Sequence, residues 1–167
     1  MIDLTSLYPI RYNMVKNIGK GMRVVYYYDD ELKYCPVKKY LAQFYITARD
    51  KTKHKKDKID LLFRIDSKIN FVLTHQGSPV SPISYPLDKN YDYFEIKERK
   101  NANTLIRIFY FRFNDLVVLL NVLEKPDHYD SSKEKRKIKK CMDETQTFYQ
   151  RFKTKPHLYE EYAKETN

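Results

Sequence analysis

The side chains best suited to chemistry are cations that alternate with apolar residues in three short segments in the second half of the chain. Lys97 lies in the first segment, Arg107 in the second and Lys125 at the end of the third. Guanidinium and ammonium groups bind phosphate oxygens and can stabilise the charge that develops when a phosphodiester is cleaved. Arg107 is our first candidate for a phosphate ligand. The alternative, which we weigh equally, is a core-edge arginine paired with Glu95 or Glu98.

Cleavage of RNA without a metal ion also requires a general base and a general acid. A carboxylate between cations, such as Glu95, could act as the base, or it could be a salt-bridge partner on a charged strand face. His128 has an imidazole suited to proton transfer near neutral pH, or it is an incidental loop residue. The candidate catalytic residues are therefore Arg107, Lys97, Lys125, Glu95 and His128.

A second group of cations lies near the start of a helix that we expect to begin near Ser132. Positive charge at a helix N-terminus opposes the helix dipole, so a function such as phosphate contact could explain why it is retained. Tyr149, farther along the same helix, could stack on a base, and it also fits the apolar core stripe. The basic run Asp50–Lys58 could contact phosphate too, or form a solvated interhelical loop and first turn. The candidate RNA-binding residues are Arg99, Lys133, Lys135, Arg136, Lys137 and Tyr149.

Length and composition limit the classes of protein to consider. The chain has 167 residues, which suit one domain, and a formal net charge of +10 at pH 7. This charge favours an anionic partner such as nucleic acid, an acidic protein or a membrane surface, or it is a solvated lysine-rich surface. Cys35 and Cys141 lack the spacing of a metal site, so we expect no metal, cofactor or disulfide framework. We find no membrane-length apolar run or secretory signal pattern, and therefore expect a cytoplasmic protein.

Hydrophobic periodicity predicts a strand and two helices before the basic segments. Arg23–Tyr28 has the composition of a strand, and Pro36 suits the first position of a helix. A second amphipathic period runs from Ile59 to Gly77, where glycine favours a helix end. Two helices joined by a short charged loop predict an antiparallel helical hairpin on one face of a sheet.

The segment Tyr93–Lys125 predicts three strands joined by two tight turns. Asparagine at each connection tolerates the left-handed backbone that hairpins need, and the almost unbroken apolar run Leu116–Leu123 predicts the sheet centre. Ser131 and Glu134 have the spacing of a capping box, which predicts the start of a C-terminal helix. The expected fold is therefore α+β, with a small, twisted, antiparallel-rich sheet, a helical hairpin on one face and a C-terminal helix.

The order of these elements and three local segments resemble the RelE/ParE toxin superfamily, and within it the HigB-like branch of phage-derived toxins. Tyr93–Lys97, YFEIK, is similar to the aromatic-aliphatic-Glu-Leu-Arg strand of that branch. Leu105–Phe111, LIRIFYF, is similar to its Tyr-Arg-Ile strand. Val118–Lys125, VLLNVLEK, resembles its Leu-Leu-His-x-Phe-x-Lys-Lys segment.

The resemblance spans roughly residues 22–152 and implies a RelE-like fold. We expect one domain at residues 22–155, an N-terminal extension at 1–21 that could be flexible, and a C-terminal tail at 156–167. Three positions depart from the usual pattern of the branch. Lys97 replaces an arginine, Asn121 replaces a histidine, and Lys125 is the one lysine kept of a pair.

Through this resemblance, the chain is expected to be the toxin of a type II toxin–antitoxin system, a metal-independent, ribosome-dependent endoribonuclease that cleaves mRNA and inhibits translation. The implied partners are a cognate helix-turn-helix antitoxin, the ribosome and mRNA, with no membrane and no cofactor. The same superfamily includes ParE-like inhibitors of DNA gyrase, and the fold alone does not choose between these activities. A non-catalytic, basic RNA- or protein-binding module of phage origin is the third alternative.

Overall fold

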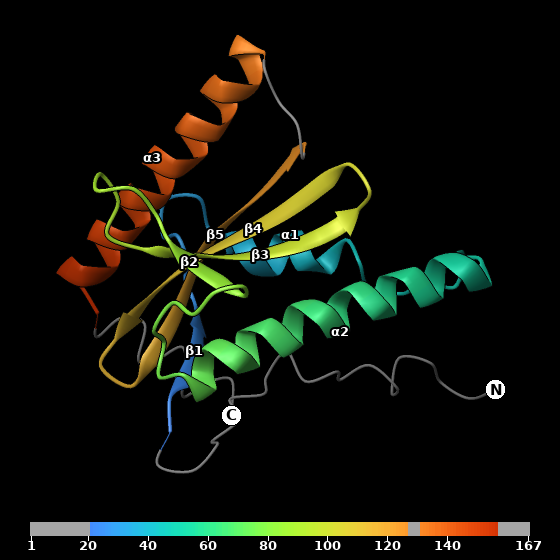
Figure 1. The fold of residues 1–167 in the computed structure, drawn as a ribbon, viewed down its shortest axis with the longest axis horizontal. Helices are drawn as coiled ribbons and strands as arrows, with labels where there is room; N and C mark the ends of the chain where they lie inside the picture. Colours follow the sequence, from blue (N-terminus) through green and yellow to red (C-terminus); the bar gives the residue numbers. More distant parts are fainter. Residues whose placement is uncertain (1–20, 127–130, 157–167) are drawn as a thin grey trace.

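A computed structural model describes residues 21–126 and 131–156, which form three helices and a five-stranded sheet (Figure 1). In chain order the elements are β1 (Arg23–Tyr26), α1 (Pro36–Ala42), α2 (Thr52–Thr74), β2 (Ser84–Pro86), β3 (Phe94–Asn101), β4 (Thr104–Phe113), β5 (Leu116–Pro126) and α3 (Ser132–Thr154). The predicted α+β class and element order are confirmed, with β2 as an additional edge strand. Predictions for residues 1–20, 127–130 and 157–167 lie outside the described residues.

The sheet has the strand order β1-β5-β4-β3-β2. β1 runs parallel to β5, while the other three neighbouring pairs are antiparallel. The prediction that the apolar run from Leu116 is the sheet centre is wrong, because β2 pairs with the outer edge of β3 and makes β4 central. β5 still lies between two strands, with a core on each face, which accounts for its unbroken apolar sequence.

Two hydrophobic cores lie on opposite faces of the sheet, with α1 and α2 on one face and α3 on the other (Figure 1). Successive side chains of a strand point to opposite faces, so neighbours on β4 belong to different cores. Ile108 joins Leu41 of α1 and Ile65 of α2 in the first core. Phe109 joins Phe148 of α3 in the second. The prediction that both N-terminal helices cover one sheet face is therefore confirmed.

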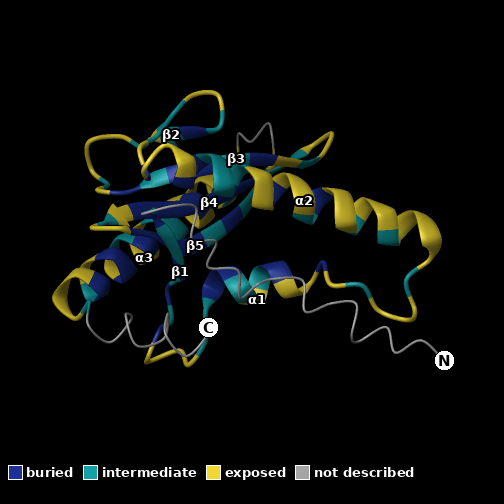
Figure 2. Cartoon of the chain, turned by 90° about the horizontal axis from the view of Figure 1, so that it is seen from below, coloured by how far each residue is buried: buried dark blue, intermediate teal, exposed yellow. Residues whose placement is uncertain are grey.

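α2 begins earlier than the sequence pattern predicted. We expected the basic run to be a loop and first turn, with the helical period resuming at Ile59. The helix instead begins at Thr52, because no proline or glycine interrupts the run and lysine is a good helix former. The first buried residue of α2 is Leu61, so no residue from 52 to 60 is buried (Figure 2). At about 1.5 Å per residue, this exposed part of α2 is roughly 13 Å long.

A β-bulge decides which side chains of β5 face α3. The register between β4 and β5 slips by one residue between Phe109 and Tyr110. Because such a slip shifts the alternation of side chains, Leu120 and Leu123 both belong to the core beneath α3 although they are three positions apart, which would place them on opposite faces of a regular strand. The bulge also turns Asn121 toward α3, where its amide is hydrogen-bonded.

The ends of the two long helices follow the predicted capping signals. α3 begins at Ser132 as expected, because Ser131 Oγ accepts a hydrogen bond from the Glu134 N–H at 3.2 Å and donates to the Glu134 carboxylate at 2.8 Å. Gly77, just after α2, has a φ of 75°, and a Cβ there would lie 3.1 Å from the Cβ of Arg112.

Among the described residues, no helix has the length and apolar character needed to cross a membrane.

Candidate functional site

The predicted cations of the sheet share the face that packs against α3, on three consecutive rungs of β3, β4 and β5. Residues opposite one another on neighbouring strands have Cβ atoms about 5 Å apart, so the side chains within a rung are neighbours. The rungs are Glu95–Phe109–Asn121, Lys97–Arg107–Leu123 and Arg99–Leu105–Lys125. Four of the five predicted catalytic residues, together with Arg99, therefore lie on adjacent rungs of one face.

Glu95 is at the centre of this arrangement. Its carboxylate is ion-paired with Nε of Arg107 and with Lys97, whose Nζ lies 3.2 Å from the second oxygen. The side chains of Glu95 and Arg107 are 4% and 10% exposed, whereas that of Lys97 is 38% exposed. The ion pair that we considered as the alternative role of Arg107 is therefore formed. We call Glu95, Lys97 and Arg107 the Glu95 cluster.

The outer nitrogens of the Arg107 guanidinium are not used by this ion pair. Among the described residues, Nε is the only nitrogen of Arg107 with a hydrogen-bond partner. The guanidinium carbon lies 5.4 Å from the centre of the Phe109 ring, which supports its orientation by a cation–π contact. Arg107 can therefore keep its bond to Glu95 and still offer donors to a second anion.

α3 closes one end of the Glu95 cluster. The Tyr93 hydroxyl donates to the backbone carbonyl of Met142 at 2.7 Å, and the Asn121 amide donates to Glu144 at 3.1 Å. Burial and the neighbouring Glu144 carboxylate raise the pKa of Cys141 to about 11. Because the thiolate is the reactive form, this cysteine of α3 is a poor nucleophile at neutral pH. α3 is therefore hydrogen-bonded here to β5, through Asn121, and to Tyr93 just before β3.

Residues on this face of β3 and β5 are more exposed the farther they lie from the Glu95–Asn121 rung, where α3 is hydrogen-bonded. Along β3, Glu95 is buried, Lys97 is half-buried and Arg99 is exposed. Along β5, Asn121 is buried and Lys125 is half-buried. The outer cations are therefore nearer to solvent than the Glu95 carboxylate.

Tyr85 belongs to the same face, although sequence reasoning missed it. It pairs with Glu95 from the edge strand β2, so it extends the first rung. Lys97 Nζ lies 4.3 Å from the centre of its ring, and its hydroxyl donates to the Pro82 carbonyl at 2.9 Å. A strand of three residues among prolines has too few positions to show a period of two, so sequence periodicity could not indicate it. The half-buried ring could stack on a base beside the cations.

Glu98 lies on the opposite face of β3 and takes no part in the cluster. Its carboxylate is 2.7 Å from Arg64 Nε and 2.8 Å from Lys68 Nζ. Burial acts to raise the pKa of Glu98, but the hydrogen bonds from Lys68 and Arg64 outweigh burial, so this pKa is lowered. The same two cations donate to the backbone carbonyls of Arg99 and Lys97, at 3.2 and 2.5 Å. Glu98 therefore fastens α2 to the edge of β3.

The predicted RNA-binding lysines and arginine of α3 are exposed. They occupy the first turns of the helix, directly after the segment that follows β5, and are Lys133, Lys135, Arg136 and Lys137. Burial acts to raise the pKa of Glu124 on β5, but the hydrogen bonds from Lys100 and Tyr40 and the nearby charge of Lys137 outweigh burial, so this pKa is lowered. The basic surface of α3 thus begins near the end of β5 that carries Glu124.

Tyr149 does not join these residues. It lies twelve residues beyond Lys137, or about 18 Å along the helix axis. Its side chain is buried, with its ring edge-on to Phe111 at 4.7 Å between centres. The structure therefore places Tyr149 in the core beneath α3, which is the second of the two roles that the sequence allowed.

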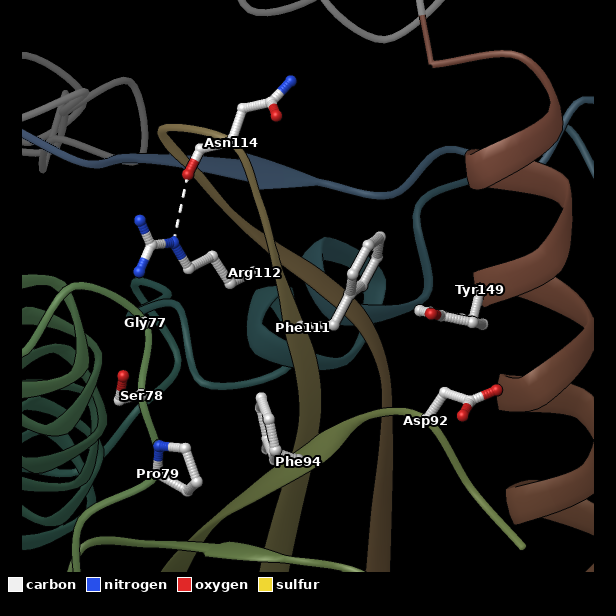
Figure 3. Close-up of a pocket in the computed structure, with 9 residues that line it drawn as sticks. All are labelled: Gly77, Ser78, Pro79, Asp92, Phe94, Phe111, Arg112, Asn114 and Tyr149. Atoms are coloured by element: carbon white, nitrogen blue, oxygen red, sulfur yellow. Dashed lines mark hydrogen bonds between the residues drawn. The ribbon is translucent and has the colours of Figure 1, made fainter.

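Tyr149 also borders a hollow of about 510 Å³ near the C-terminal end of β4 (Figure 3). The rings of Phe94 and Phe111 form other walls of this hollow. The side chain of Arg112 points away from these rings, and its Nε donates to the carbonyl of Asn114 at 3.2 Å. Arg112, the cation that lines the hollow, is directed away from its aromatic walls, so we do not place the candidate site here.

The Glu95 cluster combines a carboxylate that could accept a proton with two cations that could hold a phosphate. His128, the histidine predicted as a candidate for proton transfer, lies outside the described residues. Comparisons with protein-family models, curated proteins and solved structures gave no match to this chain. The assignment of a function therefore depends on the sequence and on the geometry of this face.

Proposed function

We propose that the chain is the toxin of a type II toxin–antitoxin system, with a RelE-like fold, and that it cleaves mRNA on the ribosome at the Glu95 cluster. Support comes from the order of the elements and from the position of the three HigB-like segments on adjacent strands. The observation that carries the proposal is one carboxylate held between two cations beside an open, basic sheet face.

Each residue of the cluster has a distinct role in this proposal. Lys97, the more exposed cation, exchanges its contact with Glu95 for the phosphate of the entering strand. The freed carboxylate oxygen accepts the proton of the ribose 2′-OH, and the 2′-oxygen attacks the phosphorus. Arg107 stabilises the charge on the phosphate oxygens, using the guanidinium nitrogens not bonded to Glu95. The departing 5′-oxygen takes a proton from a general acid, for which His128 is the sequence-based candidate.

The burial of Glu95 gives a physical reason for dependence on the ribosome. Its side chain is only 4% exposed, so the RNA must displace Lys97 and approach in one orientation before the base can act. A free, flexible strand loses conformational entropy when it is ordered in this way. An mRNA already held on the ribosome has lost much of that freedom beforehand, as in other cases of pre-organised binding.

A second candidate function is a non-catalytic RNA-binding module. The observation in its favour is that both oxygens of Glu95 already have a cation partner, as in a structural ion pair. This candidate predicts RNA binding that weakens steeply with salt, without strand cleavage.

Expression in growing bacteria tests the proposal. The chain should stop translation and produce new transcript 5′ ends. Lys97→Ala should remove both effects at equal protein abundance, whereas Lys89→Ala, at an exposed lysine outside the cluster, should leave them unchanged. Normal growth without new 5′ ends would contradict the proposal, and DNA damage signalling with intact transcripts would favour the gyrase inhibitor.

A further inference from the structure

The outward face of α2 carries an apolar stripe that the sheet does not cover. Phe63 is 71% exposed, and Ile59, about one turn earlier, is 37% exposed. Positions four residues apart lie on the same face of a helix, so Phe71 lies on this face two turns beyond Phe63, with Ser67 between them. Between Phe63, Phe71 and Ile83 lies a groove of about 420 Å³. An exposed aromatic residue beside an apolar groove is a common feature of protein interaction sites.

A run of cations precedes the stripe at the start of α2. The first turns of α2 have no acidic residue among their opening positions and no side-chain cap. This basic segment contains Lys51, Lys53, His54, Lys55, Lys56 and Lys58. Asp57 and Asp60 offset part of the charge, and Lys58 is paired with Asp50 at 2.9 Å. Positive charge at a helix N-terminus opposes the dipole, so the charge of these residues is unfavourable for the start of α2.

We propose that this surface of α2 docks an amphipathic helix of an acidic partner protein. The apolar side of the partner helix lies on Ile59, Phe63 and the groove, while its carboxylates face the lysines of α2. The stripe favours a protein over RNA, because phosphate contacts require cations but no apolar stripe. The inference does not depend on RNA cleavage, because the stripe lies on the opposite side of the sheet from the Glu95 cluster.

Two other binding modes, a second copy on α2 and an added strand beside β3, fit the structure less well. A second copy of the chain would bring one basic segment against another, and each chain already carries a net charge of +10. An added β-strand at the outer edge of β3 would compete with Lys68 and Arg64. Their side chains already bond the carbonyls of Lys97 and Arg99 at that edge.

A fluorescent peptide tests the proposal with the full-length chain. The probe has leucines at i, i+3, i+4 and i+7 and glutamates elsewhere, and its control has the same composition with the leucines scattered around the helix. The patterned peptide should bind, and Phe63→Ala should weaken binding by about tenfold. Leu32→Ala is the matched control, because Leu32 is 47% exposed on a different part of the molecule. Unchanged thermal unfolding would show that Phe63→Ala folds normally.

Several outcomes would overturn the proposal. The proposal is wrong if the patterned peptide does not bind, or if the scattered peptide binds equally well. It is also wrong if Phe63→Ala and Leu32→Ala weaken peptide binding by the same factor. If an RNA oligonucleotide displaces the peptide, and its own binding is weakened by Phe63→Ala, the surface would be assigned to nucleic acid. Dimers in sedimentation that Phe63→Ala abolishes would assign it to self-association. RNA cleavage should be unchanged in Phe63→Ala, so failure here and failure of the proposed function are separate results.

Discussion

At the scale of single residues, the two cations bound to Glu95 differ in what they contribute. The side chains of Arg107 and Glu95 are both almost fully buried. Each charge therefore compensates the other for the hydration that it loses on burial. Lys97 is 38% exposed and divides its contacts between Glu95 and the Tyr85 ring. A ligand can draw Lys97 away at little cost in stability, whereas Arg107 stays in place. This difference makes Lys97 the informative position for activity.

Stability measurements should separate the two cations. Arg107→Ala leaves a buried carboxylate without its main partner, so we expect it to lower the free energy of unfolding by about 3–5 kcal/mol. Lys97→Ala removes a partly exposed contact and should cost about 1 kcal/mol or less. Urea denaturation of both variants measures the difference. Equal losses would contradict the distinction between a structural and a displaceable cation.

At the scale of elements, α2 is fastened to the sheet at one half and projects at the other. Glu98, held by Arg64 and Lys68, joins the middle of the helix to β3. Every buried residue of α2 lies at or after Leu61. The projecting part, residues 52–60, therefore has no buried side chain to hold it to the sheet. Its Lys58 is bonded to Asp50 and to the Tyr45 carbonyl, and its basic sequence opposes the dipole.

The Glu98 network should make folding sensitive to acid. The folded-state pKa of Glu98 is lowered from its ordinary value of 4.5, so its contribution to stability is fully present above that value. The contribution is lost as the pH falls from 4.5 through the lower folded-state pKa. We expect the free energy of unfolding to fall in this window, and to fall less steeply in Glu98→Gln. Urea denaturation across the window checks this, and identical slopes would exclude the network as a cause.

Hydrogen exchange should reveal the two halves of α2. Amides of residues 52–60 have no buried side chain above them, so we expect them to exchange much faster than those of residues 61–74. Exchange followed by mass spectrometry of overlapping peptides resolves this boundary. Uniform protection along the helix would show that the projecting half is covered by something in solution.

At the scale of the whole molecule, the sheet separates two surfaces with different chemistry. The face beneath α3 carries the Glu95 cluster and opens toward Arg99 and Lys125. The other face carries α1 and α2, with the apolar stripe of α2 turned outward. The proposed RNA site and the proposed protein-docking site can therefore be occupied independently.

Much of the fold was predictable because its signals are local. Pro36 begins α1, Ser131 caps α3, and asparagines lie at both turns of the meander. The edge strand β2 was not predictable, because three residues cannot show a period. The start of α2 was missed because a lysine-rich run is equally typical of a loop and of a solvated helix.

The candidate site was predictable only in part. The hairpin turn near Asn101 was predicted from its asparagines, and it brings Lys97 opposite Arg107. The choice between Glu95 and Glu98 as the arginine's partner depends on register, and β3 has an irregularity close to that turn. The position of Asn121 beneath α3 depends on a bulge in the β4–β5 pairing, for which the sequence carries no signal.

The most direct test of the central claim is primer extension on a defined mRNA incubated with the purified chain, with and without ribosomes. We predict new 5′ ends only when ribosomes are present. They should be lost in Lys97→Ala and retained in Lys89→Ala, with all three proteins folded. An intact mRNA under every condition, or cleavage that Lys97→Ala leaves unchanged, would contradict the assignment of an RNA-cleaving site to the Glu95 cluster.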